Sequence, residues 1–519
     1  MKSDKLLDAI GMIDADLVAQ ADKTVEKGKI RYLKWLAPVA AALLIVVAII
    51  PFLKQDKPYI DNPIIEQTTG DDNFSGGQTQ PNEDEPSTEI PDLPIIIPSL
   101  DDNPLKPMVY SIKRAEYPEM VQYPSDWMNS DWTSMEAWYN SKKERKAYYG
   151  AGKNLDMFLK KTYKEFLSDS NNENRLYSPL NVYMALAMTA EITDGESRKQ
   201  ILDLLGAESI DALRKQANSI WNANYSDDGA VTSILASSIW LNKSIKFNEK
   251  TLSFLTTNYY ASSFQGQMGS DEMNKAFRSW LNEQTGGMLS NQISNMELDA
   301  ETVMALATTI FYQARWDAEF QEKYTEKSIF HSPTGDITCD FMNHKEYNSS
   351  YFWGNNFSAV GRSLANSGRM LFILPDENVS VNDLLSDNET LSFMASNGKW
   401  SNNKKIRINL SVPKFDVSSN MDLKDGLINL GITNCFDSRK SDFSSLCEND
   451  GLSISKVEHG VRVSIDEEGV VASAFTVEPL AGSAPPSEEI IDFILDRPFI
   501  FVITSEDGLP LFTGVVNIP

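Results

Sequence analysis

The sequence of 519 residues has very few of the side chains that most catalytic and metal sites need. It contains three cysteines, Cys339, Cys435 and Cys447, and three histidines, His331, His344 and His459. Their spacing forms no CxxC or HExxH pattern, which excludes the common zinc sites and a disulfide framework. A GxSxG elbow, a Walker loop and a dinucleotide-type glycine fingerprint are absent too. We therefore expect no metal, no cofactor and no catalytic residue of its own.

Basic residues are also scarce. The chain carries 47 Lys+Arg against 73 Asp+Glu, a formal charge of -26. Binding to nucleic acid needs clustered Lys and Arg that displace counterions, and only a short basic stretch near the N-terminus is present. We expect no nucleic-acid partner. In so acidic a chain, neighbouring carboxylates such as Glu467 and Glu468 are better explained as solvated charge than as an acid/base pair.

One apolar run stands out near the N-terminus. Residues 35–53, WLAPVAAALLIVVAIIPFL, contain no ionisable side chain, and as a helix they would just cross a hydrocarbon core of about 30 Å. Basic residues crowd the preceding flank: Lys23, Lys27, Lys29, Arg31 and Lys34. A cleaved signal peptide would have a shorter leader, and a core helix would be amphipathic. The run predicts an uncleaved single-pass membrane anchor, with residues 1–34 as a cytoplasmic tail and the remainder of the chain outside.

The segment after this run is acidic and rich in proline. Residues 55–107 contain nine prolines and twelve Asp/Glu against Lys57 and Lys106. Such a composition cannot bury enough apolar surface to offset the entropy lost on ordering. Residues 54–107 are therefore predicted to be a disordered linker that holds a domain clear of the membrane.

From residue 108 the composition becomes globular, and no repeat or linker divides residues 108–519. Helical periodicity covers residues 154–167 and 182–190, the second helix following Ser178-Pro179. Apolar runs typical of buried strands cover residues 232–241, 302–312, 370–374, 406–412, 461–465, 498–503 and 511–516. This order predicts one large α+β domain with its core at about 150–519. The irregular, Tyr- and Trp-rich residues 108–150 form an N-terminal extension and suggest no function.

A long stretch without regular pattern lies between two late strands. Residues 465–493 read IDEEGVVASAFTVEPLAGSAPPSEEIIDF, where small residues follow Gly469 and two prolines and three acidic residues precede the next strand. Small side chains can enter a crowded sheet, whereas Pro485-Pro486 prevents pairing beyond them. Long loops of this kind in compact domains are usually functional, and a floppy surface loop is the simpler alternative.

These residues resemble the hinge and reactive-centre loop of the serpins. Six further motifs occur in family order: residues 174–179 (NRLYSP), 276–287 (AFRSWLNEQTGG), 309–312 (TIFY) with Trp316 and Phe320, 412–415 (VPKF), 496–501 (DRPFIF) and 512–514 (FTG). Seven motifs in order over some 360 residues are specific. Residues 150–519 are therefore identified as similar to a serpin.

The resemblance implies a serpin-like α+β fold with three β-sheets, eight or nine helices and an exposed reactive-centre loop. It also implies a serine protease inhibitor that is not an enzyme. A protease attacks the loop as a substrate and forms an acyl-enzyme on its own nucleophile, and the loop then inserts into the central sheet and distorts the protease. The implied partner is a serine protease, with a cysteine protease as the alternative, and the chain is expected to be a monomer.

The hinge residues implied by the resemblance are Glu467, Gly469, Val470, Ala472 and Ala474. The segment is small and uncharged from Gly469 to Val477, so insertion should work. Val470 stands where Thr or Ser is commoner but is β-branched and uncharged. Phe475 is bulkier than the alanine usual in the family, which should slow insertion and let some inhibitor be cleaved as a substrate.

Two placements of the scissile bond are open. Counting the family's spacing from Gly469 places it between Ser483 and Ala484, and counting back from Pro485-Pro486 places it between Gly482 and Ser483. Either way a tiny residue enters the main specificity pocket of the protease. This favours elastase-like or subtilisin-like targets over trypsin-like ones, whose buried Asp would be left unpaired.

The resemblance also implies a cluster beneath the opening sheet, the shutter, and a tryptophan at the top of that sheet, in the breach. The residues concerned are Ser178, Asn181, Thr308, His459 and Trp316. Asn181 stands where the family has serine, and Thr308 where it has asparagine. An amide that has changed sides would keep His459 hydrogen-bonded. His459 is expected to be a latch and not a catalyst.

The leading hypothesis is a membrane-tethered extracellular protease inhibitor. The uncleaved anchor with a short tail indicates a bacterial cell surface. The alternative is a non-inhibitory, serpin-like surface scaffold or adhesin, for which a charged or proline-rich hinge would be expected.

Overall fold

A computed structural model of the chain describes residues 109–124, 132–152, 154–170, 172–289, 293–294, 296–396, 398–448, 451–470 and 489–519. The tail, anchor and linker expected at residues 1–107 lie outside the described residues, as does the loop segment 471–488. Within the described ranges, no helix is both long enough and apolar enough to cross a membrane.

Ten α-helices are described, and eight of them have eight or more residues. In chain order they are α4 (Trp132–Arg145), α5 (Asp156–Leu167), α6 (Pro179–Ile192), α7 (Gly195–Leu205), α8 (Ile210–Asn224), α9 (Glu249–Tyr259), α10 (Asp271–Glu283), α11 (Val381–Ser386), α12 (Asn388–Ala395) and α13 (Lys424–Asn429). Three short 3-10 helices are η2 (Lys146–Tyr148), η3 (Glu322–Tyr324) and η4 (Asn434–Phe436). The helices expected at 154–167 and 182–190 are confirmed as α5 and α6.

Helix α6 begins where the Ser-Pro pair predicts. The Ser178 hydroxyl accepts a hydrogen bond from the Asn181 backbone N–H, and Pro179 occupies the first helical position, where a missing N–H costs nothing. Every residue from Pro179 to Ile192 is buried, which fits a sequence that is apolar on all sides.

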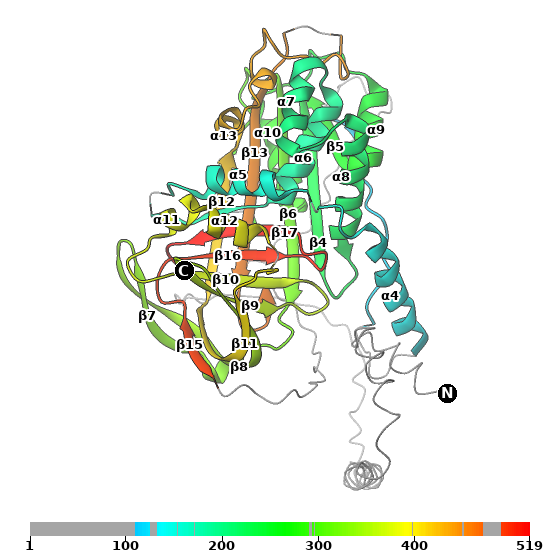
Figure 1. Cartoon of the computed structure of the whole chain (residues 1–519). Coiled ribbons are helices and arrows are strands. Elements are labelled where there is room, and N and C mark those ends of the chain that lie inside the picture. The colour runs from blue at the N-terminus through cyan, green and yellow to red at the C-terminus, as the bar shows by residue number, and fades with distance from the viewer. Residues whose placement is uncertain are drawn as a thin grey trace, which may run out of the picture. The chain divides into compact units, whose positions relative to one another are not determined.

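The first sheet has eight strands. In spatial order these are β1 (Val109–Lys113), β5 (Ala261–Gly266), β4 (Thr232–Asn242), β6 (Met304–Arg315), β14 (Gly469–Val470), β13 (Ile454–Ile465) and β12 (Phe415–Asp422), with β3 (Ser226–Asp227) paired to β4. In Figure 1 the long strands β4, β6 and β13 run side by side through the upper body. All strands expected in this part of the chain are confirmed.

The second sheet has nine strands. Its order is β15 (Ile490–Ile494), β11 (Asn403–Pro413), β8 (Gly335–Trp353), β9 (Phe357–Ser363), β10 (Arg369–Pro375), β16 (Phe499–Thr504), β17 (Pro510–Val516) and β2 (Arg175–Tyr177), with β7 (Glu326–Ser332) paired to β8. Hydrogen bonds thus join the described strands into two sheets, where three were expected. The reason is β8, whose 19 residues pair with β7 and β11 and then continue to pair with β9.

Both faces of the first sheet are covered. Alternate residues of β6 point to opposite sides, so Met304 and Leu306 join the main core with α6, whereas Ala305 and Ala307 join a second core with α10. Trp240 and Phe277 meet edge to face in this second core. Strands covered on both faces explain why the sequence shows continuous apolar runs there.

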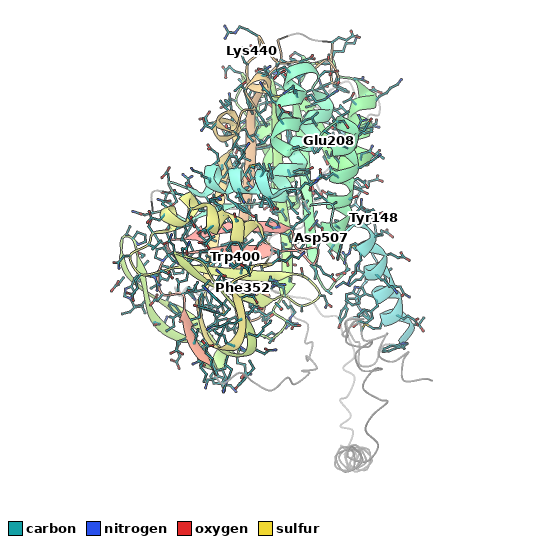
Figure 2. All side chains as sticks on the ribbon, viewed as in Figure 1. Tyr148, Glu208, Phe352, Trp400, Lys440 and Asp507 are labelled. Atoms are coloured by element: carbon teal, nitrogen blue, oxygen red, sulfur yellow. The ribbon has the colours of Figure 1, made fainter. Side chains whose placement is uncertain are left out.

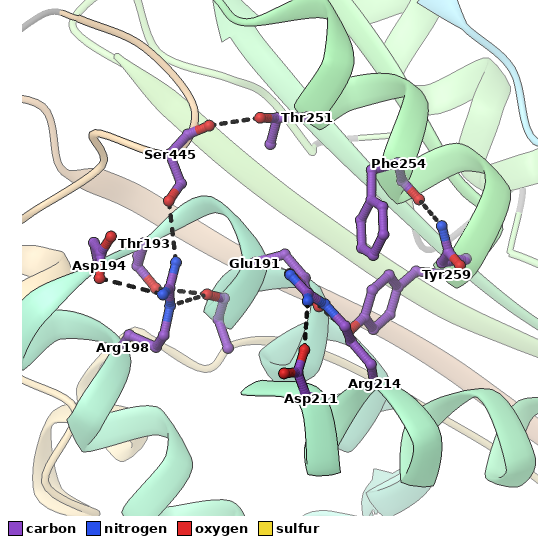
Figure 3. A network of polar contacts seen from close by, with 12 residues as sticks. Glu191, Thr193, Asp194, Arg198, Asp211, Arg214, Thr251, Phe254, Tyr259 and Ser445 are labelled. Carbon is purple, nitrogen blue, oxygen red and sulfur yellow. Dashed lines mark hydrogen bonds and ion pairs between the residues drawn. The ribbon is translucent and has the colours of Figure 1, made fainter. Parts of the chain in front are cut away.

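Buried polar contacts hold the helical layer together around Glu191 near the end of α6 (Figure 3). Arg214 of α8 donates to both carboxylate oxygens, at 2.8 and 2.7 Å, and the Tyr259 hydroxyl of α9 donates at 2.6 Å. Nearby, Arg198 of α7 donates to the Ser445 hydroxyl at 3.0 Å. Arg198 also donates to the Ala190 carbonyl of α6 at 3.0 Å, so hydrogen bonds join α7, α8 and α9 to α6, which shares a core with β6 and β13.

The extension before residue 150 is part of this body. Strand β1 pairs antiparallel with β5 and becomes the outermost strand of the first sheet. The Tyr117 ring stacks on Trp221 of α8 at a centroid distance of 6.1 Å. Trp138 of α4 is buried and donates its indole N–H to Asp228 at 3.2 Å.

Candidate functional site

The site is the place where β6 and β13 separate. The two strands pair directly, in parallel, from Met304 opposite Ile454 to Thr309 opposite Gly460. Above that point no pairing joins residues 310–313 of β6 to residues 461–464 of β13 in these fully described strands. At the last closed row the Thr309 hydroxyl donates to the Gly460 carbonyl at 2.9 Å.

The predicted hinge occupies the upper end of this opening. Gly469 and Val470 form β14, which pairs antiparallel with Arg315 and Ala314 of β6, and Val470 also pairs with Ile465 of β13. The two residues that directly precede the loop segment therefore already lie between the two strands. Val470 is only 1% exposed.

Glycine is required at the first position of β14. A Cβ at Gly469 would lie 2.4 Å from the Ala314 carbonyl oxygen and 2.7 Å from the Arg315 Cα, both backbone atoms that cannot move aside. The backbone approaches this closely because β14 enters a gap only one strand wide.

A tight turn returns the chain from β13 into β14. The Asp466 carboxylate accepts hydrogen bonds from the Glu468 and Gly469 backbone N–H groups, at 2.9 and 3.1 Å. The Trp316 indole N–H donates to the Asp466 carbonyl at 2.9 Å, and its backbone N–H donates to the Glu468 carbonyl at 2.9 Å. The buried Trp316, expected at the top of the sheet, thus holds the hinge turn directly.

Glu467 is held by two side chains distant in sequence. Lys414 donates to one carboxylate oxygen at 2.7 Å, and the Thr325 hydroxyl donates to the other at 2.8 Å. Partial burial raises the pKa of Glu467, but the two hydrogen bonds outweigh this effect and keep it below its ordinary value. Glu467 therefore acts as an ionised anchor for the hinge.

A buried arginine supports Trp316 from behind. The Arg362 guanidinium of β9 lies 5.4 Å from the Trp316 ring centroid and 3.9 Å from that of Phe320, and it pairs with Glu346 of β8. Burial lowers the pKa of Arg362 to about 10, so it remains charged at neutral pH. The top of the first sheet is thereby fixed to the second sheet.

The predicted shutter residues lie together, just below the point where the strands part. His459 of β13 is opposite Thr308 of β6 and accepts a hydrogen bond at Nε2 from the Ser178 backbone N–H, at 3.0 Å. Full burial lowers the pKa of His459 to about 3, although a contact with the Thr308 backbone works in the other direction. His459 is therefore neutral at physiological pH.

One expectation about this cluster is wrong. The Asn181 amide was expected to keep His459 hydrogen-bonded, yet neither its nitrogen nor its oxygen has a hydrogen-bond partner among the described residues. The Ser178 backbone supplies the bond instead, because the N–H of a residue that caps a helix is not used by the helix. Thr308 donates its hydroxyl to backbone carbonyls, Asn181's among them at 3.4 Å.

The sequence predicts the hinge and shutter residues of this site but not the side chains that hold the hinge turn. Ala472, Ala474 and the two placements of the scissile bond, Gly482-Ser483 and Ser483-Ala484, lie outside the described residues. Lys414 belongs to a motif that was recognised only as a strand, so its charge was the overlooked signal. Thr325 and Arg362 carried no local signal, because their partners are 142 and 46 residues away in sequence.

Comparison with known proteins agrees with this geometry. Residues 153–519 match the family model described as Serpin (serine protease inhibitor). Serpin-ZX from Arabidopsis thaliana is 28% identical over 370 residues, which cover 67% of this chain and 93% of that protein. Alpha-1-antiproteinase from Rattus norvegicus is 27% identical over 394 residues, covering 72% and 90%.

A solved structure gives the same result. Tengpin, a thermophilic serpin, in the native state superposes with a TM-score of 0.63 and 27% identity, covering 72% of this chain and 94% of that one. Fold and site thus define a protease inhibitor and not an enzyme. The chain belongs to the serpin family.

Proposed function

We propose that the chain inhibits serine proteases as a suicide substrate, with its cleaved loop inserting between β6 and β13. One observation carries the proposal: β14 already fills the top of the gap, and the adjacent rows at 310–313 and 461–464 are not paired to each other. A loop released by cleavage can continue from Val470 along this path and add a strand.

The expected energy is sufficient to disable a protease. About a dozen inserted residues gain roughly 1 kcal/mol per ladder hydrogen bond, and about six inward side chains gain roughly 1 to 2 kcal/mol each, some 20 kcal/mol gross. This exceeds the roughly 5 to 15 kcal/mol that stabilises a typical protease domain.

The proposed targets have a small specificity pocket. With cleavage after Ser483, or after Gly482 in the alternative placement, the residue entering the pocket is tiny. Elastase-like and subtilisin-like serine proteases accept such residues, and papain-like cysteine proteases are a second option.

The decisive experiment mixes the full chain, kept in a mild nonionic detergent, with subtilisin or elastase. We expect a covalent complex that survives boiling in SDS. A catalytically inactive protease provides the control, because it forms no acyl bond. Clean cleavage without such a band, across several small-pocket proteases, would exclude the inhibitor.

We further propose a single-pass cell-surface protein of bacterial type. Support comes from the uncharged residues 35–53, the basic flank before them and the acidic residues 54–107 after them. Protease treatment of intact cells should remove residues 108–519 and leave the tail protected. A chain that fractionates with soluble protein would contradict the anchor.

The alternative is a non-inhibitory surface scaffold or adhesin. The hinge favours an inhibitor over a scaffold, because Gly469 and Val470 are both uncharged and are already paired within the first sheet. A scaffold has no need of a glycine at this hinge position, where a Cβ would meet the backbone of β6.

A further inference from the structure

A groove lies on the outward face of the lower part of the second sheet. Its volume is about 670 Å³, and its lining includes Tyr324, Asn343, Tyr347, Asn409 and Ile494. The strand register explains this arrangement. Asn409 of β11 lies opposite Lys345 of β8 on one side and Asp492 of β15 on the other, so their side chains share one face. Figure 1 shows β7, β8, β11 and β15 gathered in this part of the molecule.

Large apolar side chains are exposed in the groove. Tyr347 is 61% exposed, Tyr324 52% and Ile494 45%. Apolar surface left open within one concavity of a strongly acidic protein marks a contact site more often than chance exposure does. Tyrosine suits such a site, since its ring gives contact area at little entropic cost while its hydroxyl remains solvated.

Polar contacts hold the floor of the groove in shape. The Asn343 amide donates to the Tyr324 carbonyl at 2.8 Å, and the Asn409 amide donates to Asp492 at 2.7 Å. The Arg407 guanidinium lies 5.3 Å from the centre of the Tyr347 ring. The groove is therefore ordered before any partner arrives, which lowers the entropic cost of binding.

Residues of the groove lie close in the chain to contacts on both sides of the loop segment 471–488. At one end Tyr324 precedes Thr325, whose hydroxyl binds Glu467 in the hinge turn. At the other end β15 begins directly after the segment, with the Glu489 carbonyl bonded to the Arg407 N–H at 3.1 Å. The hinge turn that precedes β14 and strand β15 that follows the segment thus both adjoin residues of this surface.

The short distance in sequence between the predicted scissile bond and β15 places a bound protease near the groove. Only four residues separate Ala484 from Glu489, and the five steps between them, at about 3.6 Å each, cover at most about 18 Å. A protease that holds the scissile bond covers about 800 Å² of its partner, a patch roughly 30 Å across. Its surface can therefore reach the β11–β15 end of the groove.

We propose that this groove is a secondary docking site for the target protease, where Tyr324 and Tyr347 bind an apolar surface loop beside the protease's active-site cleft. The proposal rests on the proposed inhibitory function. Charges in the groove nearly balance, with Lys345 against Glu326 and Asp492. We therefore expect contact with an uncharged protease loop and weak dependence of binding on salt.

The test measures binding of the full chain to catalytically inactive subtilisin and elastase, beside complex formation with the active enzymes. Tyr324→Ala and Tyr347→Ala should each weaken binding to the inactive protease about tenfold. The association rate with active protease should fall equally, while the stoichiometry of inhibition stays unchanged. Tyr347→Phe should retain most of the binding, because the ring remains.

The matched control is Tyr148→Ala, a similarly exposed tyrosine in the extension at the right of Figure 2, which should change nothing. Equal binding of the wild type and both groove variants would overturn the docking site. So would a change in oligomeric state of the groove variants alone, because it would reveal contact between copies of the chain. Loss of inactive-protease binding without any covalent complex would retain the docking site and reject the trapping mechanism.

Discussion

At the scale of single residues, the opening in the first sheet depends on side chains that cannot be exchanged freely. Gly469 leaves no room for a Cβ, Val470 is completely enclosed, and His459 is a neutral imidazole in a site without water access. Two of these conditions have a measurable consequence: His459 affects proton binding, and Val470 affects the fate of the protease.

Acid should weaken the protein through His459. Its pKa is about 3 in the folded chain and about 6.5 in the unfolded chain, so the unfolded chain binds the extra proton. The stabilisation is complete above pH 6.5 and is lost as the pH falls toward 3. Between pH 7 and 5 this amounts to about 2 kcal/mol. His459→Gln should remove this slope from urea unfolding curves.

The control for this experiment is His331→Gln, since His331 is exposed and its side chain is 57% accessible. This variant removes a histidine without altering the buried site around His459. Equal slopes for the wild type and His459→Gln would show that the buried imidazole is not the group being titrated.

Val470→Arg should convert the inhibitor into a substrate. The side chain is 1% exposed between β6 and β13, and an unpaired charge there costs several kcal/mol. Insertion should stall, and the protease should release the cleaved chain. The ratio of SDS-stable complex to cleaved chain measures this. The control is Val470→Thr, which is uncharged and β-branched and should still trap the protease. Full trapping by Val470→Arg would mean that insertion does not start at β14.

At the scale of elements, the sequence predicted those parts of the fold whose pattern is complete within one segment. Helix α6 followed from Ser178-Pro179 and an apolar run, and the strands followed from continuous apolar stretches. Strand β1 did not, because five residues become a strand only by pairing with β5 some 150 residues later. Helix α4 was missed since Trp138 is its only buried residue, which leaves no amphipathic stripe.

The candidate site shows the same division. Gly469, Glu467 and His459 could be predicted from the sequence, because each of them belongs to a recognisable serpin motif or matches a position known in the family. The clamp on Glu467 could not be, since Thr325 and Lys414 approach it only after both sheets have formed. Two sheets are present where three were expected for a related reason. The sequence of residues 335–353 alone does not indicate that one long strand pairs with two sets of neighbours.

The helical layer should depend on the bidentate contact between Glu191 and Arg214. Arg214→Met would keep most of the packing. Of the two side chains that donate to the buried Glu191 carboxylate, Arg214 and Tyr259, only Tyr259 would remain. We expect a loss of about 2 kcal/mol, at the low end for a broken buried pair because Arg214 is partly exposed.

Urea unfolding measures this change, and Asp211→Asn is the matched control. Asp211 pairs with the same arginine but its side chain is 76% exposed, so its replacement should have little effect. Equal losses for both variants would mean that the arginine stabilises the layer through Asp211 as much as through Glu191.

At the scale of the whole molecule, the native chain stops short of its most completely paired state. In the part of the chain that the structure describes, β6 and β13 of the first sheet pair directly up to Thr309 and Gly460, and Gly469 and Val470 lie between them further up. Cleavage within residues 471–488 should therefore raise the midpoint of thermal unfolding by tens of degrees, as the new strand completes the sheet. Differential scanning calorimetry before and after cleavage measures this shift.

Cleaved Val470→Arg supplies the comparison, since its loop cannot enter the sheet. Its midpoint should remain near that of the intact chain. An unchanged midpoint in the cleaved wild type would place the loop outside the sheet and favour the scaffold alternative.

The hydrogen bond from Thr309 to Gly460 marks the tip of a crack in the first sheet, and its position has a kinetic consequence. An advancing strand meets one closed row at a time, so each step breaks bonds worth about 1 kcal/mol and makes bonds on both sides of the new residue. The activation barrier is thereby divided into small increments. In the proposed mechanism, this stepwise route lets insertion compete with hydrolysis of the acyl bond.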